Sequence, residues 1–216
     1  MGQRDFIHVS LFTGAYGLDL GIEWAGFTTV AFAEVDPVAV ETVARNRPLL
    51  APFARPRDVR TLTGTVLLAE ASAFLGRPLR RGDVDLLSGG PPCQSFSTAG
   101  RRGSVSDPRG WLVFEFVRLV DEVRPRFFLM ENVRGLLSAP IRHRPHAQRG
   151  RGYPPLGEDE RPGSALRLLL DAFEAIGYSV SYALLQAADY GVPQIRERVF
   201  FYGAREGTPP PFPPPT

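Results

Sequence analysis

Apolar runs of strand length alternate with segments of helical periodicity along most of the chain. The predicted strands are residues 6–12, 28–33, 84–88, 127–131, 179–185 and 198–203. The predicted helices are residues 18–25, 37–45, 110–123 and 164–176. Such alternation indicates an α/β fold, with a mainly parallel sheet and helices on both faces.

Turn and capping residues set the limits of these predicted elements. Gly26 ends the first helix, and Asp36 followed by Pro37 is typical of a helix N-cap and first turn. Ser164 is the expected N-cap of the last helix, and Gly177 is its expected stop. Each predicted helix is therefore bounded by residues that favour its start or its end.

Two segments lack the periodicity of a helix or a strand. Residues 138–163 are rich in Arg, Pro, Gly and acidic residues, so we expect one long surface loop there. Residues 206–216 contain runs of proline, which exclude a sheet or helix and are typical of a linker. We therefore expect one domain over residues 1–205, followed by a tail of linker type over residues 206–216.

The composition, with 44% hydrophobic and 22% charged residues, is that of a soluble globular protein. No apolar run approaches the roughly 20 residues of a membrane span, and no secretory leader is evident. A single cysteine excludes an internal disulfide, so we expect a reducing, cytoplasmic location. The net charge of +2 does not by itself indicate nucleic acid, although every basic residue is an arginine, which suits phosphate recognition. The sequence predicts no metal site.

The cysteine, Cys93, follows two glycines and two prolines directly after the predicted strand 84–88. These residues force the chain out of the strand at the carboxyl edge of the sheet, where open α/β folds place their chemistry. A lone cysteine is more often a small hydrophobic residue of the core. The turn-forming and polar neighbours of Cys93 favour instead an exposed, reactive thiol.

A glycine-containing loop joins the first predicted strand to the first predicted helix. It reads Phe12-Thr13-Gly14-Ala15-Tyr16-Gly17, and its glycines would let the backbone approach a nucleotide-like ligand. Glu34 follows about 20 residues later, as expected of an acid that binds a ribose. A simple turn and a solvated carboxylate are the alternatives. Together the loop and the acid indicate an adenosyl cofactor.

Polar residues stand at two further strand ends. Glu131 and Asn132 follow the apolar residues 127–130, and apolar neighbours would favour a protonated carboxyl that acts as a proton donor. A strand-end acid that caps a helix is the alternative. Gln194, Arg196 and Arg198 alternate along an extended segment and would point to one side. A solvated charge run is the usual interpretation, but their place at the same sheet edge favours a ligand contact.

These segments, in this order, resemble the catalytic part of the cytosine-C5 DNA methyltransferases, from about Val9 to Thr216. Each segment alone is weak evidence, whereas their conjunction is highly specific. The matching segments are the cofactor loop Phe12 to Gly17, the ribose-binding Glu34, the adenine-binding Asp58, the nucleophile motif Pro92-Cys93-Gln94, Asp107-Pro108-Arg109-Gly110 with Leu112, the acid motif Glu131-Asn132-Val133, and Gln194-x-Arg196-x-Arg198.

The resemblance implies a Rossmann-like S-adenosylmethionine-dependent fold and methylation of cytosine C5 in DNA, as in restriction–modification systems. It implies that Cys93 adds to C6, that Glu131 stabilises charge in the ring, and that Arg196 and Arg198 position the base. The target base must be flipped out of the duplex. The implied cofactor contacts are Phe12, Thr13, Gly14, Tyr16, Gly17, Glu34, Val35, Asp58, Val59, Pro91 and Leu112. The implied DNA contacts are Gln94, Ser95, Ser97, Arg101, Arg102, Asn132 and Gln194, with residues 95–109 as a mobile loop.

The chain departs from the family pattern in two places. Tyr16 stands where the family usually has a glycine, and it would either crowd the methionine part of the cofactor or stack beside it. Family members also continue beyond the position of Thr216 into a target-recognition domain and two further motifs. A fragment, one subunit of a split enzyme and a decayed gene product each account for this. A non-catalytic cofactor-binding or DNA-binding module, and the same chemistry on RNA or a nucleotide, are the alternative functions.

Overall fold

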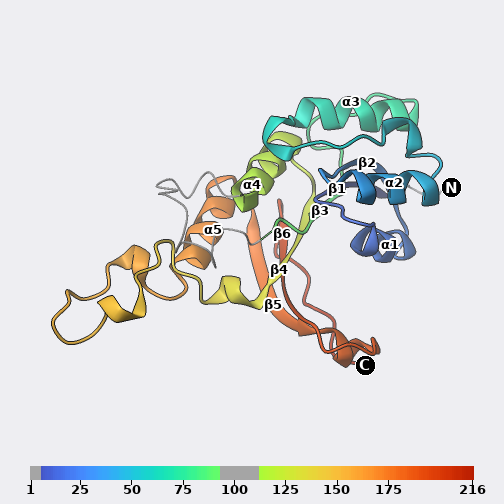
Figure 1. Ribbon diagram of the computed structural model, residues 1–216. Coiled ribbons are helices and arrows are strands. Elements are labelled where there is room, and N and C mark those ends of the chain that lie inside the picture. The colour runs from blue at the N-terminus through green and yellow to red at the C-terminus, as the bar shows by residue number, and fades with distance from the viewer. Residues whose placement is uncertain (1–5, 93–111) are drawn as a thin grey trace.

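The computed structural model describes residues 6–92 and 112–216, which form one six-stranded sheet with helices against it (Figure 1). The strand order is β2-β1-β3-β4-β6-β5. Strands β1 to β4 are parallel to one another, whereas β6 is antiparallel to β4 and β5. The strands are β1 (Phe6–Leu11), β2 (Phe27–Ala33), β3 (Leu86–Gly89), β4 (Phe127–Val133), β5 (Ser179–Gln186) and β6 (Glu197–Ala204). The predicted α/β fold with a mainly parallel sheet is confirmed.

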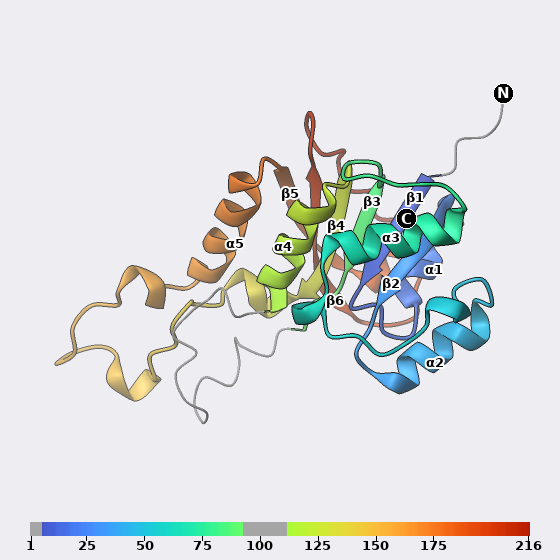
Figure 2. The same ribbon diagram turned by 90° about the horizontal axis from the view of Figure 1, so that it is seen from above.

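The helices cover the two faces of the sheet unequally. Figures 1 and 2 together show α3, α4 and α5 in one layer and α1 on the opposite side. The helices are α1 (Gly17–Trp24), α2 (Pro37–Asn46), α3 (Gly64–Leu75), α4 (Leu112–Val123) and α5 (Ser164–Ala175). Four of them were predicted, whereas α3 was not, since its apolar residues do not keep to one face. Thr63 caps α3 by accepting a hydrogen bond from the Val66 amide at 3.3 Å.

The predicted cap of α5 is wrong in one detail. Ser164 is the first helical residue and Gly163, with φ of 80°, is the N-cap. The Ser164 hydroxyl donates to the Asp159 carbonyl at 3.1 Å and accepts from the Ile141 amide at 2.9 Å. It therefore ties the long loop to the helix instead of capping the helix.

Residues 138–163 contain only two short 3-10 turns, His146–Gln148 and Glu158–Glu160. Both ribbon views show the segment projecting from the body of the molecule (Figures 1 and 2). The buried carboxylate of Glu160 pairs with Arg144, whose Nε atom lies 3.0 Å from Oε1. The projecting loop is thus closed by an ion pair at its base.

Three phenylalanines fix β4, the strand that carries Glu131, against the helical layer. Phe128 of β4 stacks on Phe173 of α5 with ring centroids 4.2 Å apart, and Phe116 of α4 meets Phe128 edge-on at 6.0 Å. All three rings are fully buried. Burying large aromatic side chains is among the strongest apolar contributions to folding. Buried aromatic packing therefore holds β4 against α4 and α5.

The proline-rich segment 206–216 forms neither helix nor strand. The Tyr190 hydroxyl donates to the Pro213 carbonyl at 3.0 Å, and the Thr216 amide donates to the Asp189 carbonyl at 2.9 Å. These contacts lay the tail beside the turn that leads into β6. In the described part of the chain, the helices are too short or too polar to cross a membrane.

Candidate functional site

The loop between β1 and α1 has an unusual backbone. Phe12, Gly14 and Tyr16 all have positive φ, at 52°, 55° and 76°. Only glycine adopts this region without strain, so Phe12 and Tyr16 are held there by their surroundings. The Gly14 amide donates to the Glu34 Oε2 atom at 2.7 Å, which joins the loop to the end of β2.

Glu34 is fully engaged by backbone amides. Its Oε1 atom accepts from the Val35 and Asp36 amides at 2.7 and 2.9 Å, in addition to the bond from Gly14. The half-buried carboxylate is therefore fixed in orientation. Asp36 caps α2 through a hydrogen bond from the Val38 amide at 2.8 Å, as the sequence predicted.

Most of the predicted cofactor-binding residues line one cavity at the carboxyl edge of the parallel strands. Its volume is about 400 Å³. Its walls come from the β1–α1 loop, the end of β2, the segment 57–60, the segment after β3 and the start of α4. The lining residues are Phe12, Ala33, Glu34, Val35, Arg57, Asp58, Val59, Arg60, Gly90, Pro92 and Leu112.

Asp58 already has a partner in this cavity. Arg60 holds its carboxylate through Nε and Nη2, at 2.9 and 2.5 Å from Oδ2. These hydrogen bonds, with one from the Arg60 amide, hold the pKa of Asp58 below its usual range. An adenine amino group would therefore meet an ionised carboxylate that it shares with an arginine.

Tyr16 turns away from the cavity. Its ring is 6% exposed and belongs to a small core cluster with Phe32, Val40, Val43 and Leu50. Its hydroxyl donates to Glu23 at 2.5 Å, and the Arg47 guanidinium lies over its ring at 5.0 Å from the centroid. The ring of Tyr16 therefore neither crowds the predicted cofactor position nor stacks beside it.

A second cavity of about 400 Å³ adjoins the first and shares Phe12 and Gly90 with it. This cavity brings the β1–α1 loop together with residues that were predicted to act on the substrate. The lining residues are Ser10, Leu11, Phe12, Thr13, Gly17, Leu18, Asp19, Gly89, Gly90, Glu131, Arg196 and Phe200.

Glu131 lines this second cavity together with Arg196. Its Oε1 atom lies 2.8 Å from Arg198 Nε and 3.6 Å from Arg196 Nη2. The two arginines thus point to the same side, as the alternation along the chain predicted. A Cβ atom built on Gly90 would lie 3.3 Å from the other oxygen, Oε2. The carboxylate is therefore packed against the backbone segment that leads to Cys93.

Asn132 is buried, not presented to a ligand. It is 2% exposed, and its Nδ2 atom donates to the Pro91 carbonyl at 3.0 Å. Its Oδ1 atom accepts from the Val133 amide at 2.9 Å. We therefore assign Asn132 the role of holding the segment before Cys93 against β4, in place of the predicted DNA contact. Gln194 is exposed and lines neither cavity.

Six predicted site residues lie outside the described residues: Cys93, Gln94, Ser95, Ser97, Arg101 and Arg102. Pro92, the last described residue before them, lines the first cavity. The described part of the chain thus fixes where the segment with Cys93 begins.

A buried polar network next to the second cavity was missed in the sequence. His8 of β1 contacts Thr29 Oγ1 through Nδ1 at 2.9 Å and Ser88 Oγ through Nε2 at 2.8 Å. Asp19 of α1 lies on the other side of Ser88, with Oδ1 3.8 Å from His8 Nε2. An acid in an otherwise apolar first turn, Gly17-Leu18-Asp19-Leu20, is the sequence signal that could have revealed it.

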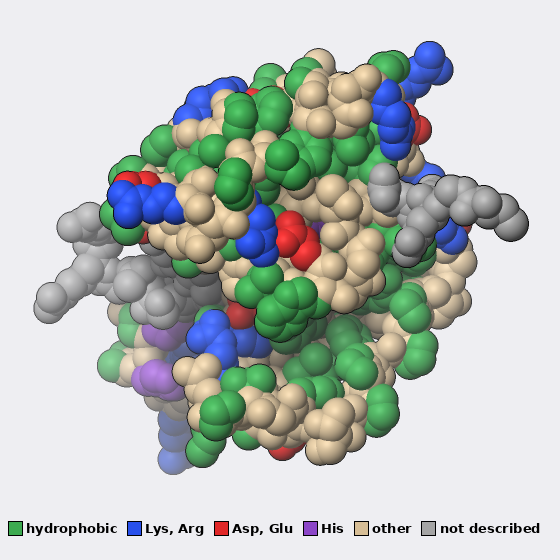
Figure 3. All heavy atoms as spheres, turned by 90° about the vertical axis from the view of Figure 1, so that its right-hand side faces the viewer, with side chains coloured by type: hydrophobic (Ala, Val, Ile, Leu, Met, Phe, Trp, Pro, Cys, Tyr) green, Lys and Arg blue, Asp and Glu red, His purple; other side chains and the backbone are tan. Residues whose placement is uncertain are grey.

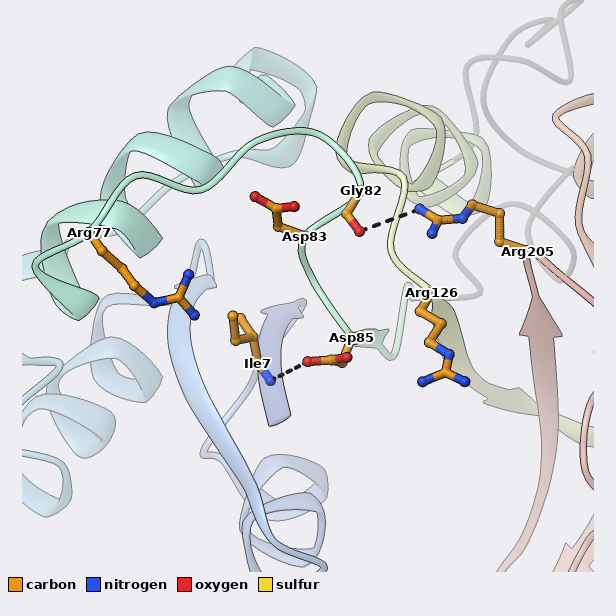
Figure 4. A pocket seen from close by; sticks show the side chains of 7 residues that line it. All are labelled: Ile7, Arg77, Gly82, Asp83, Asp85, Arg126 and Arg205. Atoms are coloured by element: carbon orange, nitrogen blue, oxygen red, sulfur yellow. Dashed lines mark hydrogen bonds between the residues drawn. The ribbon is translucent and has the colours of Figure 1, made fainter. Parts of the chain in front are cut away.

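Another cavity lies at the opposite edge of the sheet and contains no predicted site residue (Figure 4). The Asp85 carboxylate accepts there from the Ile7 amide at 2.9 Å, and Arg205 reaches the Gly82 carbonyl at 3.4 Å (Figure 4). These polar groups hold strand ends together. The described residues contain no group of three or more histidine, cysteine or acidic side chains placed to hold a metal ion.

The strand order, the glycine-containing loop and the cavities at one sheet edge define a Rossmann-like methyltransferase fold. The family model of the C-5 cytosine-specific DNA methylases matches residues 6–214. The chain therefore belongs to the C-5 cytosine-specific DNA methylase family. This confirms the resemblance noted in the sequence.

Comparisons with individual proteins agree with this family assignment. The chain is 40% identical to the Type II methyltransferase M.AquIA of Picosynechococcus over 208 residues, which are 96% of this chain and 75% of that protein. It is 37% identical to the Type II methyltransferase M.FnuDI of Fusobacterium nucleatum, covering 92% of this chain and 46% of that protein. The chain thus spans three quarters of one relative and less than half of the other.

Solved structures show the same fold. A DNA modification methyltransferase encoded in an E. coli prophage superposes with a TM-score of 0.63 at 28% identity, covering 93% of this chain and 47% of that one. The S. pombe Dnmt2 methyltransferase superposes with a TM-score of 0.59 at 19% identity, covering 94% and 51%. The second likeness concerns the fold alone.

Proposed function

We propose that the chain catalyses methyl transfer from S-adenosylmethionine to C5 of cytosine in DNA. The observation that carries the proposal is the position of Glu131. Its carboxylate faces Arg196 and Arg198 on one side and Gly90 on the other, in a cavity that adjoins the predicted cofactor cavity. A carboxyl group, two guanidinium groups and the start of a cysteine loop therefore meet beside one pocket.

The residues at the two adjoining cavities fit the cofactor. Glu34 has a fixed carboxylate for a ribose, Asp58 has an ionised carboxylate for an amino group, and Val35 is exposed for stacking on a base. A Cβ atom added at Gly14 or Gly17 would meet no atom of the described residues within 4 Å, so the backbone is open to a ligand. When bound, S-adenosylmethionine supplies an electrophilic methyl group.

Cys93 provides the nucleophile in this proposal. Its thiolate forms a bond to C6 of the cytosine ring, and the electron pair displaced from the C5–C6 double bond makes C5 nucleophilic. After C5 has gained the methyl group, a base removes the C5 proton. The returning electron pair re-forms the double bond, and the thiolate leaves. Asn132 supports these steps by fixing the Pro91 carbonyl two residues before Cys93.

Glu131 and the arginines act on the ring. Addition at C6 pushes negative charge toward N3, and a proton shared between Glu131 and N3 stabilises it. Arg196, 47% exposed, is free to turn toward the exocyclic oxygen of the base, whereas Arg198 holds Glu131. The base reaches this pocket only when flipped out of the duplex. Arg101 and Arg102 remain the proposed phosphate contacts.

A second protein chain that carries target recognition remains part of the proposal. On β4 and β6 the side chains facing α4 and α5 are buried, whereas Phe127, Leu129, Phe200 and Tyr202 on the opposite face are only partly buried. Figure 3, which views the molecule from the right-hand side of Figure 1, shows hydrophobic side chains exposed among polar ones over this face of the molecule. We propose that the second chain packs on this partly open apolar face.

The test is transfer of a labelled methyl group to DNA, RNA and free nucleotides, with and without the product of the neighbouring open reading frame. Labelled DNA that yields 5-methylcytosine on digestion supports the proposal. Activity only with the second chain supports a split enzyme. Labelled RNA or nucleotide with unlabelled DNA would contradict the proposed substrate. Cofactor binding without any transfer, with and without the second chain, would favour the non-catalytic alternative.

A further inference from the structure

Asp19 is a buried carboxyl group that lacks a full set of partners among the described residues. It is 1% exposed, lies in the first turn of α1, and lines the second cavity beside Gly17 and Leu18. Its Oδ1 atom accepts a long hydrogen bond of 3.5 Å from the Ser88 hydroxyl, and the Ser10 hydroxyl of β1 lies close enough to lower its pKa. Its Oδ2 atom is buried and has no hydrogen-bond partner in the described part of the chain.

An unpartnered buried carboxylate oxygen is costly, and native proteins rarely keep one. Asp19 is too deep for solvent to satisfy it, yet it belongs to the wall of a cavity. A donor from a bound molecule would complete its hydrogen bonds. A cationic donor would do so best, because charge-assisted bonds are about twice as strong as neutral ones.

The two adjoining cavities indicate which donor this is. Glu34 and Asp58 line the first cavity, which suits the ribose and adenine of the cofactor, whereas Asp19 lines only the second. The two cavities share Phe12 and Gly90, so a cofactor whose ribose lies at Glu34 can extend the part beyond its ribose into the cavity of Asp19. In that part, only the α-ammonium group can donate hydrogen bonds, because the sulfonium has no N–H or O–H.

We propose that Asp19 binds the α-ammonium group of the cofactor's amino-acid end through Oδ2, an inference that rests on the proposed function. Nearby charges are consistent with this role. His8 faces Asp19 from β1, and Tyr16 and Glu23 lie on the α1 side. Glu131 and Arg196 also line the cavity. Burial lowers the pKa of His8 to about 3, so that ring supplies no positive charge near neutral pH.

The same environment predicts a pH signature. Burial raises the pKa of Asp19 to about 7, with Glu23 adding to the effect. An ammonium ligand needs the ionised form, so binding releases a proton wherever the free carboxyl is protonated. Affinity should therefore rise with pH up to about 7 and then level off. Between pH 8 and pH 6 the expected loss is about tenfold, the fraction still ionised one unit below the pKa.

Calorimetric titration of Asp19→Asn with two ligands tests the inference. S-adenosylhomocysteine carries the ammonium group, whereas 5′-deoxy-5′-methylthioadenosine lacks the whole amino-acid end. We expect Asp19→Asn to weaken the binding of S-adenosylhomocysteine at least tenfold at pH 8, which is the scale of one charge-assisted hydrogen bond. Binding of 5′-deoxy-5′-methylthioadenosine should stay within twofold, and the pH dependence should vanish. Asp171→Asn, at an exposed site on α5, is the matched control and should change nothing.

The outcomes separate this inference from the proposed function. Unchanged binding of S-adenosylhomocysteine to Asp19→Asn overturns the inference. An equal loss of affinity for both ligands also overturns it, because Asp19 would then stabilise the fold rather than bind the ammonium group. A wild-type protein that binds neither ligand contradicts the proposed cofactor itself, and the inference falls with it.

Discussion

The Nε atom of Arg198 lies 2.8 Å from the Oε1 atom of Glu131, across the antiparallel pair of β6 and β4. Arg198 is 25% exposed and Glu131 is 23% exposed, so the pair is partly shielded from water. The two residues are 67 positions apart in the chain (198 − 131). The register of two strands therefore sets the orientation of the proposed catalytic carboxyl group.

Removing that arginine should slow methyl transfer without preventing cofactor binding. We expect Arg198→Ala to lower the single-turnover rate about 10- to 100-fold, because one charge-assisted hydrogen bond orients the carboxyl group. Arg134→Ala is the matched control. Arg134 is an exposed arginine just after β4, and its partner is Glu197 rather than Glu131. Equal rates for the two variants would show that Arg198 does not position Glu131.

The carboxyl group itself should matter more than its orientation. Glu131→Gln keeps the shape of the side chain but cannot share a proton with N3 of the base. We expect the single-turnover rate to fall at least about 10²-fold, the lower end for a lost general acid. Binding of S-adenosylhomocysteine, measured by calorimetry, should not change. A rate close to that of the wild type would remove Glu131 from the mechanism.

Gly90 gives a steric test of the same contact. A methyl group at this position would lie 3.3 Å from Glu131 Oε2, closer than ordinary van der Waals contact, so the carboxylate must shift. We expect Gly90→Ala to slow transfer roughly tenfold, since small displacements of a reacting group are costly. Gly21→Ala, whose methyl group would meet no described atom within 4 Å, is the control and should be as active as the wild type. A Gly90→Ala enzyme as fast as that control would show that the contact between Gly90 and Glu131 does not constrain the carboxylate.

His8 and Asp19 should act in opposite directions on the pH dependence of stability. Burial lowers the pKa of His8 to about 3, so the unfolded chain binds a proton that the folded chain does not, and stability falls below pH 6.5. Burial raises the pKa of Asp19 to about 7, so the folded chain keeps a proton that the unfolded chain loses. Asp19 therefore lowers stability as pH rises from about 4 to 7.

Between pH 4 and 6.5 the two effects oppose each other, and Asp19→Asn leaves only that of His8. Relative to the wild type, the free energy of unfolding of Asp19→Asn should rise with pH by up to about 1.4 kcal/mol per pH unit. Urea unfolding at pH 4.5, 5.5 and 6.5 measures this difference. If the free energy of unfolding depends on pH equally in the two proteins, Asp19 does not hold a proton in the folded state.

Much of the fold follows from local sequence. The strands and four of the five helices lie where apolar periodicity, Asp36 and Gly177 place them. Helix α3 was missed because it is apolar on several sides, packing on both β2 and α4, so that no single face is marked. Ser164 was given the wrong role because its hydroxyl serves a loop 23 residues away, which no local rule predicts.

The candidate site was predictable where chemistry has a sequence pattern. Glu34, Glu131 and the arginine pair follow strand ends or alternate along the chain, and they line the two adjoining cavities or hold the carboxylate there. The roles of Tyr16, Asn132 and Asp19 depend on packing between distant segments. Each of these side chains could face a ligand or the core, and only the tertiary structure decides between them.

Covalent trapping tests the central proposal most directly. In DNA that carries 5-fluorocytosine, methyl transfer leaves fluorine on C5 instead of a proton that a base can remove, so the adduct at C6 persists. We predict a covalent protein–DNA complex that forms only with S-adenosylmethionine, and mass spectrometry of its peptides should place the bond on Cys93. Cys93→Ser should form no complex while still binding S-adenosylhomocysteine. Methylation of ordinary DNA without any Cys93 adduct on the fluorinated DNA would contradict the proposed mechanism.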